Sequence, residues 1–128
     1  MQLFVPPKFH PLALLVAGLV LPWRLRHVDQ VTRVEIDDAS LGRLRALDGR
    51  RAVLCPNHSY VADSVVMYHL SSLLREHWCF LSALENFIPP VQGLLLRNVG
   101  VYSVVRGMPD MRSYRGTRQL LAAGRHRT

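Results

Sequence analysis

Apolar and polar residues form short blocks along this 128-residue chain, and their periods predict a mixture of helices and strands. Apolar residues between Val61 and about Glu76 recur at intervals of three and four, which is typical of a helix with one buried face. Short apolar runs predict strands at residues 31–36, 51–55, 77–83 and 100–106. Further helices are predicted at residues 38–47, 85–98 and 108–123, with Gly49 and Gly124 as stop signals and an interruption at Pro89 and Pro90.

Strands that alternate with helices indicate an α/β fold with a largely parallel sheet and helices on its faces. The chain is 49% hydrophobic, which is enough for one core, and at 128 residues it is too short for two domains. One domain is the default. We expect an incomplete α/β domain over residues 31–128, preceded by an apolar, membrane-associated N-terminal segment over residues 1–30.

The most apolar segment is PLALLVAGLVLPWRLR, near the N-terminus. Its apolar run from Leu12 to Leu21 would extend about 15 Å as a helix, whereas the hydrocarbon core of a bilayer is about 30 Å thick. Three preceding prolines and the absence of a small-residue cleavage site do not fit a cleaved signal peptide. Because Trp23, Arg24 and Arg26 follow, we expect a helix that lies in or against one leaflet; the alternative is a core helix of the domain.

The formal charge is +7, carried by fifteen arginines and the single lysine Lys8. This charge favours anionic partners, such as phospholipid headgroups, phosphorylated substrates or nucleic acid, without choosing among them. Cys55 and Cys79 both fall in runs that are expected to be interior strands. Two buried, reduced thiols are therefore the expected state of the cysteines.

The stretch CPNHSYVAD contains the most suggestive polar residues. Asn57 and His58 follow the expected strand at 51–55, and Arg106 follows the expected strand at 100–106, so the sequence predicts that they share one edge of the sheet. His58 and Asp63 would not share a face of one continuous helix. They can meet if His58 lies in a loop and Asp63 in the first turn of the next helix, where the carboxylate would orient the imidazole as a base.

PNHSYVAD resembles the first block, Asn-His-x-x-x-x-Asp, of the glycerolipid acyltransferases, which include the 1-acylglycerol-3-phosphate and glycerol-3-phosphate acyltransferases. GVYSVVR, Gly100 to Arg106, is similar to their second block, Gly-x-x-Phe-Ile-x-Arg. The resemblance extends from about Val31 to the C-terminus.

The resemblance implies a transferase of phospholipid synthesis. His58, oriented by Asp63, would deprotonate the hydroxyl of a glycerophosphate or lysophospholipid acceptor as it attacks the thioester of acyl-CoA or acyl carrier protein. Arg106 would hold the acceptor phosphate, and Asn57 and Gly100 would also belong to the substrate site. No cofactor and no metal are implied, and the expected location is peripheral or monotopic, on the cytoplasmic face of a membrane.

Two departures from the family pattern stand out. Ser103 replaces the phenylalanine of the second block, which removes an aromatic contact, and Val104 replaces its isoleucine. The third block, Phe-Pro-Glu-Gly-Thr-Arg, and the fourth are missing. RGTR, Arg115 to Arg118, imitates the third block, but it has no apolar strand before it. We therefore expect the chain to stop before the third block and to be inactive alone.

Three other interpretations remain. A zinc site that includes Cys55 and His58 lacks the ligand spacing of familiar sites. A nucleophilic Cys55 or Ser59 lacks a recognisable oxyanion arrangement. The third is an inactive fragment, or a basic protein that binds anionic membrane surfaces through Arg112, Arg115 and Arg118, together with Arg125 and Arg127. No nucleic-acid-reading motif is present.

Overall fold

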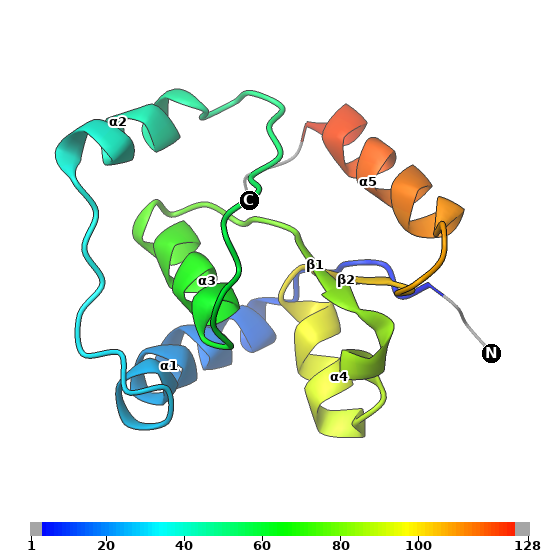
Figure 1. Ribbon diagram of the computed structural model, residues 1–128, viewed down its shortest axis with the longest axis horizontal. Helices are drawn as coiled ribbons and strands as arrows, with labels where there is room; N and C mark the ends of the chain where they lie inside the picture. Colours follow the sequence, from blue (N-terminus) through cyan, green and yellow to red (C-terminus); the bar gives the residue numbers. More distant parts are fainter. Residues whose placement is uncertain (1–3, 125–128) are drawn as a thin grey trace. The chain divides into compact units, whose positions relative to one another are not determined.

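The computed structural model describes residues 4–124, which contain α-helices and a small parallel sheet (Figure 1). The helices are α1 (Pro11–His27), α2 (Asp38–Ala46), α3 (Asp63–Leu73), α4 (Pro90–Asn98) and α5 (Met111–Ala123), with a 3-10 turn, η1 (Leu84–Phe87), before α4. The strands are β1 (Phe80–Ala83) and β2 (Val101–Val104). The chain divides into two compact units: residues 4–17 with 78–123, and residues 18–77 with 124.

The first unit is built on the parallel pair β1 and β2, in which Phe80 is opposite Val101 and Ala83 is opposite Val104. The connection between these parallel strands runs through η1 and α4, as a parallel pair requires. Both α4 and α5 contact β2. Val101, Tyr102 and Ser103 are all buried, so β2 is the centre of this unit's core.

The N-terminal segment lies along β2 and the turn before it. Its backbone forms hydrogen bonds at Val5 with Ser103, at Lys8 with Arg97 and Gly100, and at His10 with Asn98. Phe9 and Val99 also form an isolated antiparallel bridge. These bonds satisfy backbone groups on β2 and before it that β1 does not pair, which explains why a segment so far away in sequence belongs to this unit.

The second unit contains α2, α3 and the long connections before each of them. The strands predicted at residues 31–36 and 51–55 are wrong, because both segments lack secondary structure in the described chain. Over residues 31–36 the side chains still alternate, with Val34 and Ile36 half-buried and Arg33 and Glu35 exposed. β-branched residues favour an extended backbone, but a strand also needs a neighbouring strand to pair with. Within residues 4–124 neither segment is paired with another strand.

The structure confirms that the chain combines helices with a parallel sheet, but the sheet is smaller than predicted. Among residues 4–124 the sheet has only two strands, so it is parallel but not the larger sheet that the sequence predicted. The helices are close to the predicted segments, although α3 begins at Asp63 rather than Val61 and α5 begins at Met111 rather than Met108. Cys55 is exposed, contrary to expectation, whereas Cys79 is partly buried.

The N-terminal helix is longer than the apolar run that predicted it. α1 continues through Pro22 to His27, where Leu25 is only 4% exposed. Burial of Leu25 favours this continuation, although Pro22 lacks the N–H that would bond to the preceding turn. Within residues 4–124, no helix is both long enough and apolar enough to cross a membrane.

Candidate functional site

The carboxylate of Asp63 organises the loop that precedes α3. Asp63 is the first residue of the helix, and its Oδ2 accepts hydrogen bonds from the backbone N–H groups of Ser59 at 2.7 Å and Tyr60 at 2.8 Å. The backbone N–H of Asp63 donates in turn to the carbonyl of Tyr60 at 3.1 Å. The side chain and backbone of one residue thus close the turn over residues 59–62, which fixes the position of His58 immediately before it.

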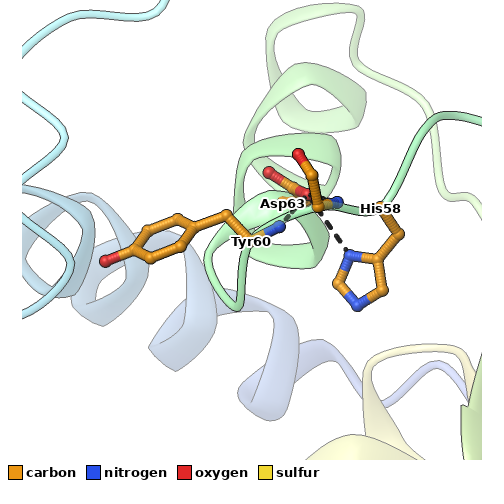
Figure 2. Close-up of polar contacts among 4 residues, drawn as sticks. His58, Tyr60 and Asp63 are labelled. Carbon is orange, nitrogen blue, oxygen red and sulfur yellow. Dashed lines mark hydrogen bonds and ion pairs between the residues drawn. The ribbon is translucent and has the colours of Figure 1, made fainter.

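His58 lies in the loop, with its ring directed at Asp63 (Figure 2). Nδ1 of His58 is 3.4 Å from Oδ2 of Asp63, and the other ring nitrogen points away from the carboxylate. This is the contact that the spacing predicted, with the histidine in a loop and the aspartate at the start of a helix. The separation is longer than the roughly 2.9 Å of an ordinary N–H···O bond, and catalytic hydrogen bonds often shorten when substrate binds.

The surroundings keep Asp63 ionised. Hydrogen bonds from the backbone of Tyr60 and Ser59, together with the adjacent His58, lower the pKa of Asp63 below its ordinary value of 3.8, against a smaller opposing effect of burial. At neutral pH the carboxylate is therefore negative, and a negative carboxylate beside Nδ1 favours the tautomer of His58 that carries its proton on Nδ1. That arrangement leaves Nε2 of His58 as the nitrogen that is available to take a proton.

Both members of this dyad, as we call His58 and Asp63, are accessible to solvent. The side chain of His58 is 68% exposed and that of Asp63 is 31% exposed. Asn57, just before the dyad, is also exposed. Because the strand at 51–55 is absent, the prediction that Asn57 and His58 follow a strand of the sheet is wrong, and their position depends on the turn closed by Asp63.

Arg106 occupies an exposed turn directly after β2. Since Ala83 and Val104 are paired in parallel strands, Glu85 and Arg106 each lie two residues beyond the same end of the sheet. Arg106 belongs to the unit that contains β2, whereas the dyad belongs to the unit that contains α3.

Gly100 forms the tight turn into β2 that the sequence predicted. Its φ is +88°, a conformation that side chains rarely adopt, and a Cβ at this position would collide with the ring of Phe9 and lie 3.0 Å from the carbonyl oxygen of Trp78. Gly100 is buried. The backbone conformation and the close packing are therefore sufficient reasons for a glycine here.

Asp110 joins the end of β2 to the start of α5, a role that was not predicted from the sequence. Its carboxylate accepts hydrogen bonds from the backbone N–H groups of Val105 at 2.9 Å, Ser113 at 3.0 Å and Arg112 at 3.1 Å. These bonds, that of Ser113 first, lower the pKa of Asp110. An aspartate before a helix is a recognised N-cap signal, but only the fold reveals its bond to the strand.

RGTR lies within α5, not at the end of a strand. The hydroxyl of Thr117 in this segment donates a hydrogen bond to the carbonyl of Ser113 at 3.0 Å and accepts one from the hydroxyl of the buried Tyr102 at 2.8 Å. Gly116 lies against the ring of Phe4. The RGTR segment therefore holds α5 on β2. This position agrees with the interpretation that the segment only imitates the third block.

Apolar side chains form an exposed stripe along α1. Its members recur at intervals of three and four, and each is at least 42% exposed: Leu12, Leu15, Val16, Leu19, Val20 and Trp23. Ala17 and Leu25 of the same helix are buried. The helix ends with Arg24 and Arg26, and the rings of Trp23 and His27 lie 5.5 Å apart. An apolar stripe with an aromatic and cationic end fits a membrane interface.

In the described part of the chain, no three histidine, cysteine or acidic side chains are grouped so that they could hold a metal ion. Comparison with known protein families, curated proteins and solved structures gives no match for this chain.

Proposed function

We propose that this chain carries the catalytic base of an O-acyltransferase that acts on phosphorylated glycerol acceptors at a membrane surface. The observation that supports the proposal best is the dyad, in which Nδ1 of His58 lies 3.4 Å from an ionised Asp63. The motif PNHSYVAD, which resembles the first block of the glycerolipid acyltransferases, supports the same assignment.

In the proposed reaction, Nε2 of His58 removes the proton from the acceptor hydroxyl. The hydroxyl oxygen attacks the carbonyl carbon of an acyl thioester, the carbon–sulfur bond breaks, and the thiol leaves with the proton that His58 returns. Asp63 stabilises the imidazolium that exists between these two proton transfers. The product is an ester, and no acyl-enzyme forms. The donor is acyl-CoA or acyl carrier protein, and the step needs no cofactor or metal.

Arg106 is the proposed ligand of the acceptor phosphate. It is exposed at the end of β2, and the planar donor fork of a guanidinium suits a phosphate group. Asn57, exposed beside His58, is proposed to contact the same acceptor. Gly100 supports this site by forming the turn that leads into β2.

The exposed apolar stripe of α1 supports a peripheral or monotopic location. A helix that buries one face and exposes Leu12, Leu19 and Trp23 on another would insert those side chains into one leaflet. We propose the cytoplasmic face of the membrane, where acyl thioesters are supplied.

The test is acyl transfer measured as thiol release and as lipid product. Purified protein is mixed with acyl-CoA or acyl carrier protein, and with glycerol 3-phosphate or its monoacyl form in vesicles. Because the third and fourth blocks are missing from this sequence, the chain alone is expected to be inactive, and the assay uses a chimera in which these two blocks of a glycerolipid acyltransferase follow residue 128. In the chimera we expect acyl transfer, loss of at least about 100-fold with His58→Ala and a smaller loss with Asp63→Asn, as is usual for a base and its orienting partner. His10→Ala, which removes another exposed histidine, is the control and should retain activity.

Two results would contradict the proposal. Failure of the folded chimera to transfer an acyl group in any donor–acceptor combination would contradict the proposed activity. Equal activity of the chimera with and without His58→Ala would exclude the dyad. For Arg106→Gln we expect a raised KM for phosphorylated acceptors with little change in the KM for the acyl donor, because only the acceptor carries the group that Arg106 would bind.

A further inference from the structure

The outer face of α5 carries an unusual concentration of positive charge. Arg112, Arg115 and Arg118 are all exposed, and the helix from Met111 to Ala123 contains no acidic residue. The arginines recur every three residues, so over one 13-residue helix they lie on neighbouring positions of the same side.

Packing of the opposite face fixes this orientation. Ser113 is buried, and Thr117 is joined to Tyr102 of β2 by a hydrogen bond of 2.8 Å. Asp110 anchors the first turn of the helix to the end of β2. The arginines are therefore held outward by the fold and do not depend on their own contacts to stay exposed.

Apolar side chains are exposed next to the arginines. Met108 is 63% exposed, Met111 is 55% exposed and Tyr114 is 57% exposed. A solvated helix face that serves only solubility has no need of these residues, whereas a helix at a lipid interface combines apolar and aromatic side chains with arginines at headgroup depth.

The same face is slightly hollowed. Arg115, Arg118, Gln119 and Ala122 line an open depression on α5. Two arginine side chains therefore lie beside one another on an open surface that a headgroup can reach from solvent.

We propose that the outer face of α5 binds anionic phospholipid headgroups and makes attachment of this protein to membranes selective for anionic lipid. Headgroups in a fluid bilayer diffuse to each arginine independently, and the acyl region accepts Met108 and Met111. A nucleic acid offers neither an apolar layer nor a use for exposed methionines, and Tyr114 alone is not a stacking series. The inference goes beyond the proposed acyl transfer and does not require His58.

The experiment is cosedimentation of the full chain with two kinds of vesicle, one of phosphatidylcholine alone and one with phosphatidylglycerol added. The variant is R115Q/R118Q, which leaves Arg112 in place because the charge of its side chain acts on Asp110, the residue that anchors the first turn of the helix. The control is R43Q/R45Q, with the same loss of charge on two exposed residues of α2. Circular dichroism checks that each variant is folded.

We expect R115Q/R118Q to bind anionic vesicles about 30-fold more weakly than the wild type at low salt, from about 1 kcal/mol for each arginine near an anionic surface. Binding to neutral vesicles should not change, R43Q/R45Q should behave like the wild type, and R115K/R118K should retain most of the affinity. High salt should remove the difference between the two vesicle types. Equal binding by R115Q/R118Q and wild type, an equal loss in the control, or tighter binding to duplex DNA than to anionic vesicles would overturn the proposal.

Discussion

The side-chain oxygen of Ser103 accepts a hydrogen bond from the backbone N–H of Val5 at 2.8 Å, while the N–H of Ser103 donates to the carbonyl of Val5 at 3.1 Å. Ser103 is 0% exposed. One residue of β2 thus holds the N-terminal segment through both its backbone and its side chain. This role explains why a small polar residue occupies this buried position of β2.

We expect Ser103→Ala to lower the free energy of unfolding by about 1–2 kcal/mol, because the N–H of Val5 loses its partner in a partly buried place. Ser103→Phe should cost more, since a fully buried serine has no space for a ring. Urea denaturation measures both variants. Ser72→Ala is the control, because its hydroxyl makes only a local, exposed bond within α3, and a comparable loss there would contradict the role of Ser103.

Gly100→Ala tests the turn into β2. The substitution places a Cβ against the ring of Phe9 and near the carbonyl of Trp78, at a φ of +88°. Together the strained backbone and the overlap should cost about 3 kcal/mol or more. Gly107→Ala is the matched control, with a φ of +78° but no atom near the added Cβ, and should cost only about 1 kcal/mol. Equal losses in thermal unfolding would show that packing at Gly100 contributes nothing.

The elements that the sequence predicted correctly depend on local signals. The predicted strands at 77–83 and 100–106 contain β1 and β2. These two strands are connected through α4 and pair with each other in parallel. The runs at 31–36 and 51–55 are also short and partly apolar, but they are not part of a strand in the described chain. Composition reports the preference of a segment for extended backbone, whereas a strand exists only where another backbone supplies the hydrogen bonds.

The candidate site shows the same division. The contact of His58 with Asp63 spans five positions, so spacing and a helix start were enough to predict it. The bond from Val105 to Asp110 requires knowledge of where β2 ends, and the bond between Val5 and Ser103 spans 98 positions. Such long-range bonds leave no periodic signal in the sequence, which is why the N-terminal segment was not predicted to join the sheet.

Asp110→Ala should lower the free energy of unfolding by about 1–2 kcal/mol, in the upper range for an N-cap, because three backbone N–H groups lose one acceptor. Asp37→Ala provides the comparison, since Asp37 caps α2 through Ser40 alone. Hydrogen exchange should locate the effect, with faster exchange at Val105 and in the first turn of α5. A loss no larger than that of Asp37→Ala would contradict the role of Asp110 as a link between strand and helix.

Asp63 should make the stability of the chain depend on pH. Its pKa in the folded protein is lowered below the ordinary 3.8, chiefly by the N–H of Tyr60 and then by Ser59 and His58. The contribution of the carboxylate is therefore complete above the ordinary pKa and is lost as the pH falls through the lower, folded-state pKa. The wild type should exceed Asp63→Asn in stability at neutral pH, and urea titrations should show this excess shrinking in acid. An excess that stays constant down to about pH 3 would exclude this linkage.

The C-terminus of α3 offers a stabilising substitution. The N–H of Glu76 donates to the carbonyl of Ser71 at 3.0 Å and that of Arg75 to Ser72 at 3.0 Å, which is the Schellman pattern, and Arg75 has a φ of +56°. Glycine is favoured at this position because a Cβ costs about 1 kcal/mol in the left-handed region. We expect Arg75→Gly to raise the free energy of unfolding by up to about 1 kcal/mol, less the entropy that glycine adds to the unfolded chain. Arg75→Ala separates the causes: it removes the charged side chain and keeps the Cβ, so a gain equal to that of Arg75→Gly would show that the backbone conformation is not the source.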